Sequence, residues 1–219
     1  VSVFPNPVDQ SAFPALSREQ RAAFREELGV PGGVRVLLHF GRDWQIKDGD
    51  IFLDALGVLV NEGRSVIGLI NQGGEEAASA AARRGLEQQV KLTGLLPQPQ
   101  KLYGAADVMV ASSRGEGMPY TVAEALCSGV PVVASDLAGH RYLGDELEAC
   151  SIVPRDAGRF ASAAEAFLDM DADETARLCA TAREWIVERL DVGAAAARLV
   201  DQYEQTIRDS STQPQVGSS

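Results

Sequence analysis

The segment from Asp107 to Ser135 reads DVMVASSRGEGMPYTVAEALCSGVPVVAS, and it decides the fold. An apolar strand comes first, followed by a loop of small residues, an amphipathic helix that stops at a Ser-Gly pair, and a second apolar strand. This order is typical of an α/β fold, in which ligands bind at the loops that leave the carboxyl ends of the strands. A helix N-terminus at such a loop has free N–H groups and a positive dipole, which suit a phosphate. With Glu116 in the loop and Glu124 on the helix, the segment predicts a site for a ligand with a phosphate at one end and hydroxyl groups at the other.

The rest of the chain continues the alternation of strand and helix. Strands are expected over 34–40, 65–71, 90–93, 107–111, 130–134 and 150–153, and helices over 18–28, 50–62, 75–88, 98–106 and near 140–143. After residue 158 only helices are expected, over 160–170, 172–190 and 192–208. The sequence therefore predicts a Rossmann-like, doubly wound parallel sheet of about six strands with a helical C-terminus.

One domain is expected over residues 15–209. Residues 1–14 are rich in proline, which excludes a helix, so they are interpreted as an extended linker that leads into the domain. Ser17 and Gln20 have the spacing of a capping box at the start of the first helix. Residues 210–219 are rich in Ser, Gln, Pro and Gly and predict a disordered tail.

Composition excludes several classes of function. The chain has 219 residues, 45% of them apolar, which indicates a soluble globular protein. Its net charge of −11 argues against nucleic acid or an anionic membrane surface as a partner, since both would repel it. No apolar run approaches the ~18 residues of a membrane span. Cys127, Cys150 and Cys179 lie far apart among apolar residues, so we expect buried reduced thiols and a cytoplasmic chain.

Two further loops carry residues that suit a nucleotide. Arg42 and Lys47 follow the strand over 34–40, and two cations on one loop of an acidic protein suit a diphosphate. The alternative is a pair of solvated surface cations. The loop over 94–98 is apolar, and Leu96 suits the face of a nucleobase, although a turn that caps the core explains this loop equally well. In a parallel sheet these loops and the Glu116 loop lie at one edge.

Four motifs, in order, resemble the C-terminal, donor-binding half of a GT-B glycosyltransferase of the large retaining family 4, also called group 1. The matching segments are FPNPVD at 4–9 with Phe13 (similar to N-G-V-D-x-x-x-F), GR at 41–42 with Lys47 (G-R-x-x-x-x-K), 113–124 (S-x-x-E-G-[FM]-P with E-x7-E) and 129–136 (G-x-P-V-V-A-[ST]-D). Each motif alone is weak. Together they are specific, and they cover nearly the whole chain.

The resemblance implies a role for each matched residue. Arg42 and Lys47, with Gly41 beside them, would hold the nucleotide diphosphate and stabilise its charge as it leaves, while Glu116 would contact hydroxyl groups of the donor sugar near the reacting carbon. Glu124 would bind the ribose hydroxyls. The remaining implied contacts are Leu96 against the base, and backbone N–H groups around Gly117, Met118, Tyr120 and Thr121 on the sugar and phosphates. No metal and no cofactor are implied, because fixed cations and a helix N-terminus stabilise the leaving group, and the nucleotide sugar is the substrate.

Several residues depart from the family pattern or imitate other sites. Asp48 stands where the family has glycine, and we expect it to turn away from the diphosphate and cap the next helix. The D-x-D at 48–50 resembles a metal motif and 169–173 the start of a calcium loop, but a helix N-cap and a helix–helix turn explain them better. His39 is expected to be a satisfied core histidine, and His140 a structural residue near the edge of the site.

The expected function is transfer of a sugar from a UDP-, GDP- or ADP-linked donor to an unknown acceptor, with retention. GT-B enzymes react in a cleft between two domains, and Val1 falls where the interdomain linker would be, so we expect the N-terminal acceptor domain to be absent here. The isolated chain is then expected to bind donor without turnover. Any membrane contact of the full-length protein would be peripheral and would lie in that other domain. The alternative is a non-catalytic nucleotide-sugar-binding subunit that needs a partner chain; a nucleotide-sugar epimerase of similar fold has no support in these motifs.

Overall fold

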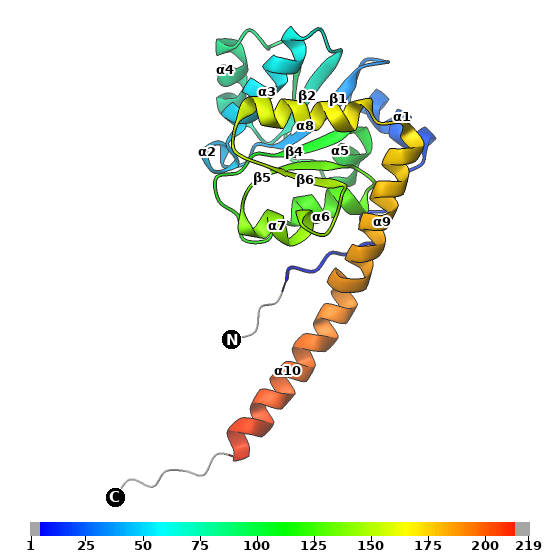
Figure 1. Cartoon of the computed structure of the whole chain (residues 1–219), viewed down its shortest axis with the longest axis vertical. Helices are drawn as coiled ribbons and strands as arrows, with labels where there is room; N and C mark the ends of the chain where they lie inside the picture. Colours follow the sequence, from blue (N-terminus) through cyan, green and yellow to red (C-terminus); the bar gives the residue numbers. More distant parts are fainter. Residues whose placement is uncertain (1–4, 213–219) are drawn as a thin grey trace, which may run out of the picture.

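The computed structural model describes residues 5–212 and confirms an α/β fold built on one parallel sheet (Figure 1). The strands are β1 (Arg35–Phe40), β2 (Val66–Asn71), β3 (Val90–Thr93), β4 (Val108–Ala111), β5 (Val132–Ser135) and β6 (Cys150–Val153). They lie in the order β3-β2-β1-β4-β5-β6, and every neighbouring pair is parallel. The chain winds outward from β1 to β3 and then returns to β4 beside β1. The carboxyl ends of β1 and β4 therefore form the topological switch point, where ligands of such sheets bind.

Helices cover both faces of the sheet (Figure 1). They are α1 (Arg18–Glu27), α2 (Trp44–Lys47), α3 (Gly49–Asn61), α4 (Gly74–Arg83), α5 (Gln100–Ala105), α6 (Tyr120–Cys127), α7 (Ala138–Gly144), α8 (Ala157–Asp169), α9 (Ala172–Leu190) and α10 (Val192–Thr212). Side chains of α3, α4 and α8 form the core on one face, and side chains of α5, α6, α7 and α9 form the core on the other. Among the helices of residues 5–212, none has the length and apolar character that crossing a membrane requires.

The central strands explain why the sequence is apolar at consecutive positions. All four residues of β4 are buried, and in β1 Leu37 packs into one core while Leu38 packs into the other. Each such side chain contributes roughly 2 kcal/mol by leaving water. A strand covered on both faces needs this continuous run, which fixes its place in the middle of the sheet.

Most predicted elements are confirmed, and the exceptions have local causes. The strands over 90–93 and 150–153 and the helix over 172–190 agree with the structure to the residue. Helix α4 ends at Arg83 instead of continuing to residue 88, because the chain turns through Gly85 with a φ of +67°. Helix α10 continues to Thr212, into the segment predicted to be a disordered tail; residues 213–219 lie outside the described part.

The segment before α1 is attached to the domain. Val8 is 3% exposed, and its N–H donates to the carbonyl of Leu190 at 2.8 Å. The guanidinium of Arg183 on α9 donates to the carbonyls of Gln10 at 3.2 Å and Phe13 at 2.7 Å. Residues 8–13 are therefore packed against the domain, with Val8 in its core. Phe4, the first residue of the lead-in motif, lies outside the described residues.

Candidate functional site

Two loops meet at the switch point. The first runs from β1 to α3 and contains the one-turn helix α2, which the sequence did not predict; Asp43 and Asp48 flank it with left-handed φ angles of 57° and 51°. The second runs from β4 to α6. The N–H of Arg114 in the second loop donates to the carbonyl of Ile46 in the first at 2.8 Å. Ser112 Oγ also donates to the carbonyls of Lys47 and Asp48, at 2.9 and 3.0 Å, so the loops are tied together through the backbone.

Lys47 and Glu116 face each other across this junction. Lys47 Nζ forms an ion pair and hydrogen bond with Glu116 Oε1, and both side chains are largely buried. Ser113 Oγ donates to the same carboxylate oxygen at 3.0 Å. The structure thus brings together a cation and a carboxylate that lie 69 positions apart in the sequence. Arg42 is exposed on the first loop, and within the described residues it has no ion-pair partner, which leaves its guanidinium available to solvent or ligand.

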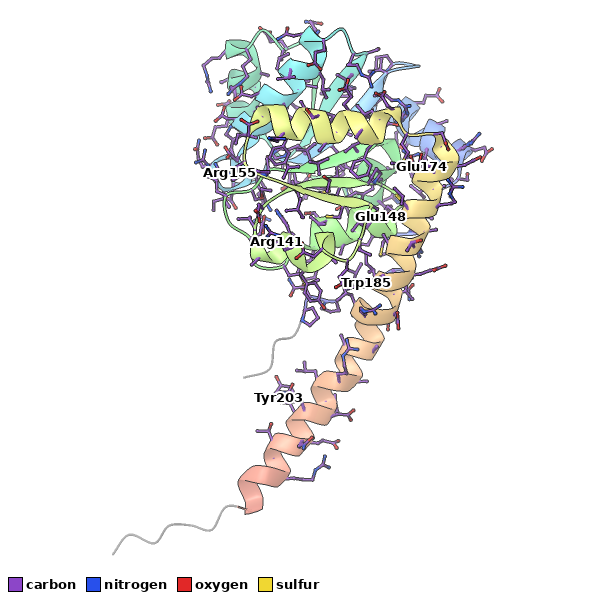
Figure 2. The ribbon with its side chains drawn as sticks, viewed as in Figure 1. Arg141, Glu148, Arg155, Glu174, Trp185 and Tyr203 are labelled. Carbon is purple, nitrogen blue, oxygen red and sulfur yellow. The ribbon has the colours of Figure 1, made fainter. Side chains whose placement is uncertain are left out.

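Asp48 also links loops at this junction, through its carboxylate. The prediction that it caps α3 is wrong. Its side chain makes no capping hydrogen bond. The carboxylate is 2% exposed and accepts from Arg114 Nη2 at 2.9 Å and from Arg155 Nε at 3.1 Å, with a second Arg155 bond at 2.5 Å. Arg155 follows β6 and projects at that end of the sheet (Figure 2). Through these two arginines, Asp48 joins three loops instead of capping a helix.

Glu124 is held at one place on α6. Tyr103 on α5 donates its hydroxyl to Glu124 Oε2 at 2.6 Å. Burial raises the pKa of Glu124, and the hydrogen bond from Tyr103 opposes that rise by favouring the carboxylate. Burial likewise raises the pKa of Tyr103 well above its ordinary value, so the phenol remains the donor. No described residue bonds the other carboxylate oxygen of Glu124, which can take a second partner.

The glycine-containing part of the second loop is shaped by close contacts. A β-carbon at Gly139, at the start of α7, would lie 1.4 Å from the carbonyl oxygen of Gly117, so only glycine fits there. Asn6 Nδ2 donates to the carbonyl of Met118 at 2.7 Å, which ties the lead-in segment to this loop. Tyr120 at the start of α6 is 51% exposed, whereas the next residue, Thr121, is partly buried against the Lys47–Glu116 junction.

Leu96 occupies a separate place at this edge. It follows β3, the outermost strand on that side, and packs partly buried against the core, while its neighbour Leu95 is 80% exposed. Asn71 Nδ2 donates to the carbonyl of Gly94 at 2.7 Å and fixes the loop to the end of β2. This geometry fits both a surface for a base and a turn that caps the core.

The two histidines are both buried beside the junction. His39 Nδ1 lies 3.0 Å from the carbonyl oxygen of Val110, and His140 Nδ1 lies 2.8 Å from that of Ser135. Burial lowers the pKa of His39 to about 4 and also lowers that of His140. His39 was expected to have partners for both ring nitrogens, but only Nδ1 has one; its Nε2 has none among the described residues. The Nε2 of His140 also has no partner among them.

The remaining predictions about reactive groups concern thiols and metals. All three cysteines are free and buried, and burial raises the pKa of Cys127 and Cys179 to about 11 and that of Cys150 to about 12. Asp171 caps α9 by accepting from the N–H groups of Asp173 and Glu174, which confirms the helix–helix turn. Among the side chains that the structure describes, those of His, Cys, Asp and Glu form no group of three that could hold a metal ion.

Comparison with known proteins identifies the family. The sequence model described as "Glycosyl transferases group 1" matches residues 34–170. The chain belongs to the group 1 glycosyltransferases. A D-inositol 3-phosphate glycosyltransferase of Thermobispora bispora is 30% identical over 202 residues, which cover 85% of this chain and 47% of that protein. The lipopolysaccharide core biosynthesis mannosyltransferase LpsB of Rhizobium meliloti is 30% identical over 66% of this chain and 44% of that protein. The chain spans about half the length of the curated relatives it matches.

Solved structures share the fold of this group 1 glycosyltransferase chain. Anabaena Alr3699/HepE, solved in complex with UDP and glucose, superposes with a TM-score of 0.82 at 23% identity, over 93% of this chain and 56% of that one. The C-terminal domain of the group 1 family protein LpcC from Francisella tularensis superposes with a TM-score of 0.70 at 17% identity, over 84% of this chain and 99% of that one. These likenesses confirm the predicted Rossmann-like sheet and its place in a GT-B fold.

Two residues of this group 1 chain contact the site in ways that the sequence did not reveal. Tyr103 lies in a short helix whose other buried residues are Leu, Gly and Ala, and only its contact with Glu124 shows what its hydroxyl does. Asn6 belongs to a matched motif, and its bond to the carbonyl of Met118 shows what its side chain does. A polar group in an otherwise buried helix was the one available signal, since such groups need a partner.

Proposed function

We propose that this chain is the donor-binding half of a retaining, metal-independent glycosyltransferase that uses a nucleotide diphosphate sugar. The observation that carries the proposal is the Lys47–Glu116 pair at the switch point between β1 and β4. The pair supports the proposal because an ammonium suits a phosphate, a carboxylate suits hydroxyl groups, and both lie at the edge of the sheet where ligands of such folds bind.

In this proposal the two charges change partners when the donor binds. The diphosphate takes the ammonium of Lys47, with the exposed Arg42 and the backbone at Gly41 on the same loop. Glu116 is then released to accept hydrogen bonds from hydroxyl groups of the sugar. The fixed cations stabilise the negative charge of the nucleoside diphosphate as the sugar–phosphate bond breaks. No metal has a role in this step.

The nucleoside contacts are also proposals. Glu124, oriented by the hydrogen bond from Tyr103, binds the ribose hydroxyls with its free oxygen. Leu96 lies against the base. The backbone N–H groups that contact the sugar and phosphates lie in the loop and the first turn of α6, at Gly117, Met118, Tyr120 and Thr121.

The acceptor side lies outside this domain in the proposal. About half of the length of the relatives is not represented in the chain, so the missing half is the place for an acceptor domain. Helix α10 extends away from the domain, with Tyr203 on the extended part (Figure 2). Its exposed apolar residues repeat at helical spacing, as expected of a face that packs on another domain. They include Val192, Leu199, Val200 and Tyr203.

The test is a transfer assay with titrations. We expect the chain to bind one of UDP, GDP and ADP, and the matching nucleotide sugar, without transferring the sugar. Because HepE was solved with UDP and glucose, UDP-glucose is the first donor to try. In the full-length protein the product should keep the anomeric configuration of the donor, and transfer should survive a metal chelator. Since relatives are named D-inositol 3-phosphate glycosyltransferases, inositol phosphate is the first acceptor to try. Transfer by the isolated chain would refute the claim that it is only half of the site.

A second candidate is a non-catalytic nucleotide-sugar-binding subunit that needs a separate partner chain. The apolar face of α10 suits a separately encoded partner as well as a domain on the same chain. The gene distinguishes the two: a reading frame that continues upstream into another α/β domain supports the enzyme, and a start codon near Val1 supports the subunit. A cytoplasmic location, with peripheral membrane contact through the other half, is part of the first proposal.

A further inference from the structure

A small pocket lies beneath the Lys47–Glu116 pair, and its walls carry both histidines of the chain. Its polar lining side chains are His39, Lys47, Ser113, Glu116, Thr121 and His140. The free space is about 10 Å³, room for about one water molecule or one hydroxyl group. The pocket therefore continues the candidate site inward.

His39 lines this pocket and has a ring nitrogen without a partner among the described residues. Its ring is 1% exposed, stacks on Phe52 with ring centroids 4.7 Å apart, and places Nδ1 3.0 Å from the carbonyl oxygen of Val110. Because a carbonyl oxygen can only accept, Nδ1 carries the proton in this contact. A buried neutral ring then has an unprotonated Nε2, which has no partner among the described residues.

His140 has the same arrangement from another element. It is fully buried at the start of α7, and its Nδ1 lies 2.8 Å from the carbonyl oxygen of Ser135. Its Nε2 is thus a second acceptor without a partner in residues 5–212. Buried polar atoms without a partner are rare in folded proteins, and two on one pocket indicate that something donates to them there.

Neither Nε2 is bonded to a neighbouring donor of the pocket lining, Thr121 included. Lys47 is paired with Glu116, Ser113 Oγ donates to the same carboxylate, and Ser135 Oγ donates to the carbonyl of Ser113 at 2.7 Å. A cation in the pocket would meet the Lys47 ammonium. A neutral group that donates an O–H fits the two acceptors better than a charged one.

We propose that His39 and His140 form a hydroxyl-binding subsite beside Lys47 and Glu116, in which a small O–H group donates to their Nε2 atoms. A water has two hydrogens and can donate to both nitrogens, whereas a hydroxyl has one and donates to one of them. The donor is either a hydroxyl of the bound sugar or an ordered water. The sugar source rests on the proposed function, whereas the water source does not.

The direct test is ¹⁵N NMR of the histidine rings in the whole chain. Both rings are expected to be neutral with the proton on Nδ1, and at least one Nε2 signal to show the shift of a hydrogen-bonded acceptor. A further change with UDP-glucose, but not with UDP, would identify a sugar hydroxyl; hydrogen-bonded Nε2 signals that neither ligand changes would identify water. Protons on Nε2, or Nε2 signals of non-bonded nitrogen in every state, would overturn the proposal.

A variant supplies an independent test. In His140→Phe a planar ring remains, but the acceptor is lost. If a sugar hydroxyl is the donor, UDP-glucose should bind about five- to tenfold more weakly, while the Kd for UDP is unchanged. If water is the donor, both Kd values should stay within twofold of the wild type, and the ¹⁵N shift of the remaining His39 Nε2 should move. The matched control is Tyr142→Phe, which removes an exposed hydroxyl from the same helix and should change neither quantity. If the wild type binds none of UDP, GDP and ADP, the proposed function fails, but the NMR result without ligand still decides for or against the subsite.

Discussion

Replacing Asp48 tests most sharply how the two site loops are held together. The residue combines a left-handed backbone (φ 51°, ψ 52°) with a buried carboxylate bonded to Arg114 and Arg155. Asp48→Gly removes the carboxylate and suits the backbone, whereas Asp48→Ala removes the carboxylate and leaves a β-carbon in a conformation that L-residues avoid. The pair of variants therefore separates the contribution of the ionic contacts from that of the backbone.

The magnitudes follow from exposure. Hydrogen bonds to charged groups contribute about 1.5–3 kcal/mol, but the Arg114 and Arg155 side chains are 55% and 35% exposed and regain water when the carboxylate is removed. We therefore expect Asp48→Gly to lower the free energy of unfolding by about 1–2 kcal/mol. Asp48→Ala adds about 1–2 kcal/mol of left-handed strain, so its loss should be about 3 kcal/mol.

Urea unfolding at pH 7, followed by circular dichroism, measures both values. Asp50→Ala is the matched control. Asp50 lies in the first turn of α3 and pairs with Arg84 at 3.0 Å on the surface, so its loss should lower the free energy of unfolding by less than about 1 kcal/mol. Equal stabilities of the Gly and Ala variants would refute the role of the backbone. A Gly variant as stable as the wild type would refute the role of the ionic contacts.

Other predictions concern pH, a hydrogen bond and a close contact. Burial lowers the pKa of His39 from 6.5 to about 4, so as the pH falls the unfolded chain takes up a proton before the folded chain does. The free energy of unfolding should therefore fall by about 3 kcal/mol between pH 6.5 and pH 4. Urea unfolding at several pH values should show that His39→Phe lacks this contribution to the pH dependence. Tyr103→Phe should lower the free energy of unfolding by about 1–2 kcal/mol at pH 7 and raise the pKa of Glu124 further. NMR titration of that carboxylate measures the change, and an unchanged pKa would contradict the hydrogen bond. Gly139→Ala should lower the free energy of unfolding by at least about 2 kcal/mol, because its β-carbon would overlap a loop carbonyl. The control Gly115→Ala, with open space at that position, should leave the free energy of unfolding nearly unchanged.

The fold could be predicted because its signals are local. Continuous apolar runs indicate strands that are covered on both faces, and glycine marks where a helix ends. Helix α2 was missed because one turn between two left-handed aspartates has no apolar period to detect. The predicted range of helix α4 was too long because the chain turns at Gly85, before the predicted end.

The site was predictable in its parts but not in its contacts. The motifs placed Lys47 and Glu116 on two loops, and the sheet order brings those loops together. That the two side chains pair directly, and that Asp48 binds two arginines from other loops, depends on tertiary distances that no spacing in the sequence encodes. The two unpartnered histidine nitrogens were equally invisible, since burial and tautomer are properties of the folded chain.

Binding of nucleotides by the wild type and by Lys47→Ala tests the central proposal most directly. Calorimetric titration with UDP, GDP and ADP should show that the wild type binds one of them and that Lys47→Ala binds it at least about tenfold more weakly, because a diphosphate loses its buried cation. Lys101→Ala is the matched control, since that lysine pairs with Glu27 on another helix and should leave the Kd unchanged. Equal binding by Lys47→Ala, or no binding of any nucleotide by the wild type, would contradict a diphosphate site at the Lys47–Glu116 pair.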